Sequence, residues 1–156
     1  MVRENHTAGL RERLYFARLL LDELDAAVAA DADRARLLAL RGAVISHLYA
    51  VPVGVLRRAA ANYQVAGAED RISLAMLTEA FRAAGVEAPE MVLVEQARQD
   101  PSDPMAWLDD QMRTAFDTPA LGRRREPPGE DNALILQAED PTEPLGPEDR
   151  NRLRRC

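Results

Sequence analysis

The chain has 156 residues, with 20 basic and 26 acidic side chains and a formal net charge of −6. All of the basic side chains are arginines, and the chain has no lysine. A net acidic chain lacks the basic surface that general nucleic-acid binding requires, and a single cysteine cannot form an internal disulfide. No unbroken apolar run reaches the ~18 residues of a membrane span, and the first residues lack the apolar core of a signal peptide. We therefore expect a cytoplasmic protein that binds neither nucleic acid nor a membrane.

The first predicted helix runs from about Thr7 to about Ala30. One apolar stripe recurs at intervals of four and three residues, and its members are Leu10, Leu14, Ala17, Leu21, Leu24 and Val28. This spacing is typical of an amphipathic helix. The hydroxyl of Thr7 is placed to accept a hydrogen bond from the first turn.

A second helix is predicted from about Arg34 to about Asn62, and either Asp31 or Asp33 can cap it. Its apolar stripe consists of Leu37, Leu40, Val44, His47 or Leu48, Val51 and Val55. Pro52 lies inside this helix. Because proline has no N–H to donate to the Leu48 carbonyl and its ring crowds the preceding turn, we expect a kink or a break there.

Two further helical segments follow in the chain. Ser73 is expected to cap a third helix, and Gly85 stands where a left-handed residue would end it. A fourth helix is expected to open at Pro89, to break at residues 100–103 and to resume as far as about Phe116.

The composition changes near residue 118 and predicts two regions. Residues 1–118 should form an all-α domain, an up-down four-helix bundle with a kinked second helix and a broken last helix. Residues 119–156 carry six of the ten prolines and no aromatic residue, so they should form a largely disordered tail. The apolar run Ala133–Leu136 in this tail is a candidate docking segment.

Three short stretches resemble the DUF6586 family of proteobacterial proteins. The stretch from Arg13 through Tyr15 to Leu24 is similar to the family's N-terminal signature, and the resemblance continues at His47-Leu48-Tyr49 and at Trp107-Leu108. It covers the body of the chain and not the tail. The resemblance implies a small, helical, cytoplasmic bacterial protein and implies no activity, substrate or cofactor.

Arg41 and His47 are separated by five residues on one helix, which is similar to the loose pattern of HEPN-type ribonucleases. In that resemblance the histidine would take a proton from a ribose 2′-hydroxyl and the arginine would hold the phosphate. Six positions along a helix turn the two side chains about 120° apart, so a paired subunit would be needed to complete the site. The alternative is that His47 forms a hydrogen bond inside the bundle and that Arg41 is solvated.

Aromatic residues supply the remaining candidate contact or pocket residues, which are Tyr15, Tyr49 and Trp107. The tyrosines could form a ligand pocket, but tyrosines in a helical bundle more often bury the ring and expose the hydroxyl. Tyr15 and Tyr49 are the candidates for a paired contact, because they lie on two helices expected to be neighbours.

Paired acidic residues raise the question of a metal site. Di-iron bundles require a Glu-x-x-His motif that points inward, and neither histidine follows a glutamate by three positions. We therefore predict no metal and no cofactor, and we expect the acidic pairs to be solvated or to cap helices. These pairs are Asp22 with Asp25, Asp31 with Asp33, and Asp109 with Asp110.

The sequence leaves three functional hypotheses open. The first is a non-catalytic protein–protein interaction module that binds either an unknown protein partner or a second copy of the chain. The second is a HEPN-like endoribonuclease that uses Arg41 and His47. The third is a regulator that binds a small ligand in a pocket at Pro52, where the Leu48 carbonyl loses its helical donor.

Overall fold

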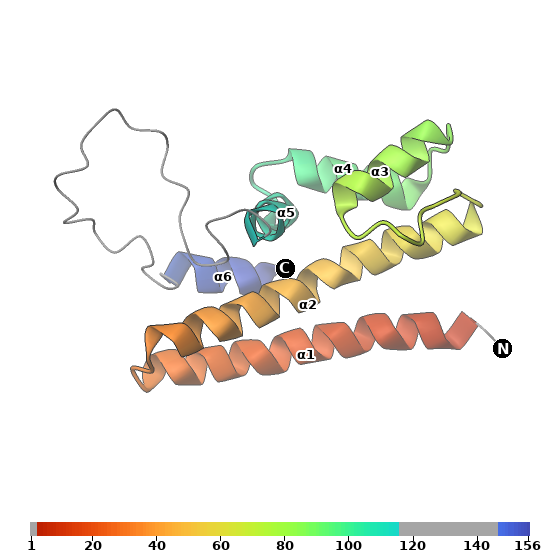
Figure 1. Cartoon of the computed structure of the whole chain (residues 1–156). Helices are drawn as coiled ribbons and strands as arrows, with labels where there is room; N and C mark the ends of the chain where they lie inside the picture. The colour runs from red at the N-terminus through yellow and green to blue at the C-terminus, as the bar shows by residue number, and fades with distance from the viewer. Residues whose placement is uncertain (1–2, 116–146) are drawn as a thin grey trace, which may run out of the picture.

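The computed structural model of this chain describes residues 3–115 and 147–156. These residues form helices and contain no strand (Figure 1), so the all-α class is confirmed. The helices are α1 (Arg3–Ala29), α2 (Arg34–Asn62), α3 (Leu74–Ala83), α4 (Pro89–Gln99), α5 (Pro104–Ala115) and α6 (Pro147–Arg155).

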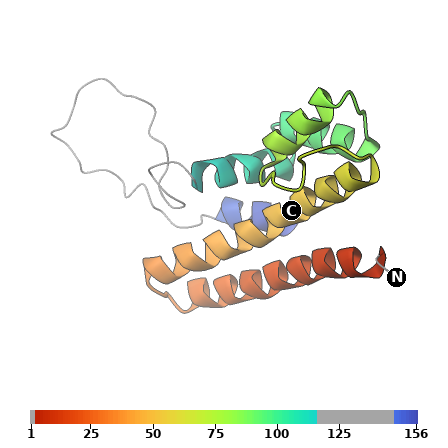
Figure 2. The ribbon, with the colours of Figure 1, turned by 45° about the vertical axis from the view of Figure 1, so that its right-hand side comes forward.

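The long helix α2 is the centre of the fold. It is antiparallel to α1 on one side, while α3, α4 and α5 pack against it from the other side, as both Figure 1 and Figure 2 show. Helix α1 makes most of its contacts with α2. The predicted four-helix bundle is therefore not confirmed, because the described residues form six helices, of which α2 is the central one.

Local chemistry explains where α2 and α3 begin and where α3 ends. Asp33 caps α2 by accepting a hydrogen bond from the Arg36 N–H at 3.0 Å, and Ser73 caps α3 by accepting one from Met76 at 3.2 Å. Thr7 does not cap α1, which already begins at Arg3. Gly85 adopts the left-handed conformation that ends α3, with φ of 65°.

Helix α2 is not interrupted at Pro52. Its core side chains are fully buried at Val44, Ile45 and Leu56. Small residues let α1 approach closely, and a Cβ built on Gly54 would lie 2.6 Å from the Leu10 side chain. Tight packing therefore continues on both sides of the proline.

Helix α2 is also the one helix in the described ranges that is long and apolar enough to cross a membrane, by length and composition alone. The central helix of a protein core meets the same criterion. Every other helix up to α5 packs on α2, and such a central position favours an apolar helix.

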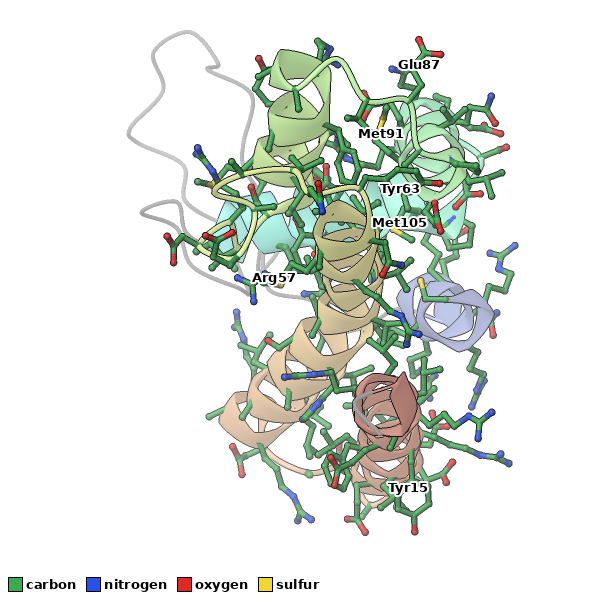
Figure 3. All side chains as sticks on the ribbon, turned by 90° about the vertical axis from the view of Figure 1, so that its right-hand side faces the viewer. Tyr15, Arg57, Tyr63, Glu87, Met91 and Met105 are labelled. Carbon is green, nitrogen blue, oxygen red and sulfur yellow. The ribbon has the colours of Figure 1, made fainter. Side chains whose placement is uncertain are left out.

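Residues 147–155 form the helix α6, which the composition of the tail did not predict. Its first turn begins with Pro147 and its last turn is rich in arginine, both of which favour a helix. Leu153 is only 2% exposed. Arg154 and Arg150 form ion pairs with Asp25 of α1, so α6 lies beside α2 between α1 and α5 (Figure 3). The remaining predicted tail, including Ala133–Leu136, lies outside the described residues.

Replacing Asp25 by asparagine is expected to loosen α6, because the substitution removes the carboxylate that holds two of its arginines. A partly exposed ion pair contributes at most about 1 kcal/mol, so the undocked fraction should rise by up to about fivefold. Trypsin, which cuts after arginine, measures this fraction as the cleavage rate within α6. Asp22→Asn on the exposed side of α1 is the matched control, and equal rates for the two variants would contradict the role of Asp25.

Candidate functional site

A pocket of about 360 Å³ lies beside Pro52. Helix α2 supplies Leu48, Val51, Pro52 and Val55 to its wall. Because Pro52 has no N–H, the Leu48 carbonyl lacks the donor that the helix would otherwise provide. This wall therefore consists of aliphatic side chains next to the Leu48 carbonyl oxygen, which lacks its usual helical N–H donor.

The opposite wall of this Pro52 pocket comes from α5 and from the end of the chain. Helix α5 contributes Met105 and Leu108, while Arg155 and Cys156 follow from α6. The Cys156 thiol lies 3.8 Å from the Pro104 carbonyl oxygen. Burial raises the pKa of this thiol to about 11, and the nearby Asp103 carboxylate acts in the same direction. Cys156 is therefore a protonated, weakly nucleophilic thiol at neutral pH.

Arg41 and Trp107, two of the predicted contact residues, come together between α2 and α5. The Arg41 guanidinium lies 5.8 Å from the centre of the Trp107 ring, and its Nη2 donates to Gln111 Oε1 at 2.6 Å. Arg41 is 8% exposed, so the expectation that it is solvated is wrong. Its planar cation stacks on an aromatic ring and fixes α5 to α2.

Tyr49 is the centre of a second polar contact between the same two helices. Its hydroxyl donates to Asp109 Oδ1 at 2.9 Å and accepts from the Leu74 N–H at 3.0 Å. The other oxygen of Asp109 accepts from Arg98 Nε at 2.9 Å, and Arg98 also pairs with Glu95 at 3.0 Å. One hydroxyl therefore joins α2 to the first residue of α3 and to α5.

The expectation that a tyrosine exposes its hydroxyl fails at Tyr49, which is 6% exposed and bonded through that hydroxyl. Asp109 likewise is not a solvated acid, because it carries the Tyr49 and Arg98 contacts. Asp25 is held by α6. Asp33 does cap a helix, as expected.

The free energy of unfolding should fall between pH 10 and 12, because Tyr49 keeps its proton in the folded state over this range. Burial raises the pKa of Tyr49 to about 12, and Asp109 adds to this effect while the Leu74 N–H opposes it. An unfolded tyrosine loses its proton near pH 10, so above that pH the unfolded state binds fewer protons and gains stability relative to the folded state. Denaturant titrations across this range should show the loss in the wild type and a smaller loss in Tyr49→Phe.

The chain contains no lysine, so no ammonium group titrates in this range. Cys156 remains in both proteins, and the difference between them isolates Tyr49. Tyr63→Phe, at a 44% exposed tyrosine, is the control. If Tyr49→Phe retained the full alkaline loss, the assignment to Tyr49 would be wrong.

His47 and Tyr15 lie away from these contacts. The His47 ring packs edge-on against Phe16 of α1 at 5.6 Å, whereas Arg41 faces α5. The two residues of the HEPN-like pattern are therefore not brought together within the chain. The buried Nδ1 of His47 has no hydrogen-bond partner, so this atom does not form the bond that the alternative interpretation expected.

Tyr15 is 58% exposed and lies on the side of α1 that faces away from α2 (Figure 3). The predicted contact between Tyr15 and Tyr49 is therefore wrong, because the two side chains leave α1 and α2 in different directions. Among the residues that the structure describes, no group of three or more His, Cys, Asp or Glu side chains could hold a metal ion.

No family model, curated protein or solved structure matches the chain. The resemblance to DUF6586 stays a prediction.

Proposed function

We propose that the chain acts as a non-catalytic protein–protein interaction module that binds its partner through the outer side of α1. The observation that supports this proposal is a cluster of exposed apolar side chains within two helical turns. The centre of this α1 strip is formed by Tyr15 and Leu19, one turn apart and 58% and 44% exposed, and Leu14 and Phe16 lie at its edges, 44% and 39% exposed. The two edge residues also contact the rest of the fold, since Leu14 lines the Pro52 pocket and Phe16 packs on His47. Contiguous exposed apolar groups on a helix are typical of a surface that another helix or a groove covers.

The surroundings of the α1 strip fit an interface. Exposed charged residues flank it, among them Arg11, Arg18 and Asp22, and a polar rim around an apolar centre is common at protein interfaces. Tyrosine is a frequent anchor in such centres. If a second copy docked on the α1 strip, the two α1–α2 hairpins would lie together and form a four-helix arrangement between the two chains.

Photo-crosslinking can test this proposal at one residue. A benzophenone amino acid at position 15 should give a defined crosslinked product in cells, whereas the same group at the exposed position 82 should not. Leu19→Glu should abolish the product from position 15. A product of twice the chain mass identifies a second copy, and mass spectrometry identifies any other partner. Equal products from both positions, or none from position 15, would refute the proposal.

The cytoplasmic location and the lack of catalysis belong to the same proposal. Two features support a non-catalytic role: Arg41 and His47 face different helices, and the Cys156 thiol has a raised pKa. His47→Ala should leave RNA cleavage at background, and a His47-dependent cleavage activity would instead favour the HEPN-like hypothesis.

The Pro52 pocket favours a second candidate function, a regulator that binds a small molecule. Its volume of about 360 Å³ falls within the range of roughly 300–1,000 Å³ for small-molecule sites. Its wall is mostly apolar, with a few polar groups at one side, which is the usual composition of such a site.

A further inference from the structure

Arg155 is the cation of the Pro52 pocket, and its terminal nitrogens are not engaged by an acid. Its Nε donates to the Asn151 carbonyl at 3.4 Å, and it forms no ion pair with any residue in the described ranges. Its neighbours Arg150 and Arg154 both pair with Asp25. The docking of α6 therefore uses two of its four arginines and leaves Arg155 beside an apolar cavity.

The shape of the guanidinium indicates which chemical group it would bind. Its parallel N–H groups match the two oxygens of a carboxylate better than a single neutral oxygen. Asp103 also lines the pocket, and its Oδ1 already accepts the Met105 N–H at 2.7 Å. A carboxylate would therefore have to bind on the Arg155 side of the opening, away from Asp103.

The size of the pocket limits the rest of the ligand. A volume of about 360 Å³ lies near the lower end of the roughly 300–1,000 Å³ range for small-molecule sites, so the ligand should be small. The walls from Leu48, Val51 and Met105 offer aliphatic surface with no side-chain hydrogen-bond donor. A linear chain of about eight to ten carbons fits this volume and this surface.

We propose that the Pro52 pocket binds a linear aliphatic monocarboxylate of medium length, with the chain along α2 and α5 and the carboxylate on Arg155. This inference rests on the second candidate function, the small-molecule regulator. Because Arg155 belongs to α6, the ligand connects α6 to the rest of the protein. Ligand binding should therefore hold α6 in its docked position.

Calorimetric titration of the full chain with decanoate and with 1-decanol, below micelle-forming concentrations, tests the proposal. Decanoate should bind about tenfold more tightly than decanol, because a hydrogen bond to a charged group is stronger than one to a neutral group. Arg155→Gln should remove this preference. Arg152→Gln is the matched control, since Arg152 lies on the same helix, is exposed and does not line the pocket.

Two further measurements place the ligand without changing the pocket. Cys156 is the only thiol in the chain, so decanoate should slow its reaction with a disulfide reagent severalfold. Nuclear Overhauser contacts should connect the methylene protons of decanoate to the Met105 methyl group. Both readouts use the wild-type protein and do not depend on whether a variant folds.

The outcomes separate the ligand class from the function on which it rests. If neither compound binds, or if decanoate binds without a contact to Met105 and without protecting Cys156, the Pro52 pocket is not a small-molecule site and both proposals fail. If both compounds bind there equally and Arg155→Gln changes neither, the site stands and the carboxylate is wrong. A preference for decanoate that Arg155→Gln removes and Arg152→Gln retains supports the inference.

Discussion

Replacing Asp109 by alanine is expected to destabilise the protein by about 3 kcal/mol, because it removes the acceptor of a buried hydroxyl and one of the two carboxylates that pair with the partly buried Arg98. Asp109 accepts from Tyr49 at 2.9 Å and from Arg98 at 2.9 Å. The Arg98 side chain is 16% exposed and that of Asp109 is 24% exposed, so water compensates only in part for the lost carboxylate. Urea denaturation followed by circular dichroism measures this loss.

The neighbouring residue offers a matched control for this experiment. Asp110 also pairs with an arginine, Arg113, but these side chains are 51% and 73% exposed. Asp110→Ala should therefore cost less than about 0.5 kcal/mol. If Asp109→Ala cost no more than Asp110→Ala, the contacts from Tyr49 and Arg98 would contribute nothing to stability.

A second large effect is expected at Phe81, where alanine should cost about 3–5 kcal/mol. Phe81 is 0% exposed and packs in the core with the fully buried Leu74 and Leu77 of the same helix. Its removal takes away a large apolar surface and leaves a cavity that the surrounding helices fill only in part. Denaturant unfolding is again the measurement.

Met76→Ala is the control for Phe81→Ala, because Met76 lies on the same helix and is 40% exposed. It should cost about 1 kcal/mol or less, as its partly exposed side chain leaves no enclosed cavity. A loss at Phe81 as small as the loss at Met76 would show that α3 does not form part of the cooperative core.

Sequence patterns located the helices well where the signal is local. The bounds of α2 follow from the Asp33 cap and the apolar stripe, and the start of α4 follows from Pro89. The beginning of α1 was missed because helical spacing of apolar residues does not mark its polar first turn. A break at Pro52 does not occur, because the packing of α2 before and after the proline compensates for one lost hydrogen bond. The kink stays a prediction.

The contacts around the candidate site could not be found in this way. Tyr49 meets Asp109 and Arg41 meets Gln111, which are 60 and 70 residues apart in the chain. Helical periodicity gives the face on which a residue lies but not the partner that this face will meet. The part of the Pro52 pocket that comes from the end of the chain was also missed, because the composition of the tail suggested no structure there. The single Leu153 between arginines was a usable signal, since one apolar residue on a charged helix can anchor that helix to a core.

The shared hydroxyl of Tyr49 has a mechanical consequence. Leu108 of α5 lines the Pro52 pocket, and the next residue, Asp109, holds the same hydroxyl that accepts the Leu74 N–H. An outward displacement of α5 at the pocket must therefore pull on the first amide of α3. The rate at which the Leu74 amide proton exchanges with solvent would then report on the position of α5, with faster exchange when α5 moves outward.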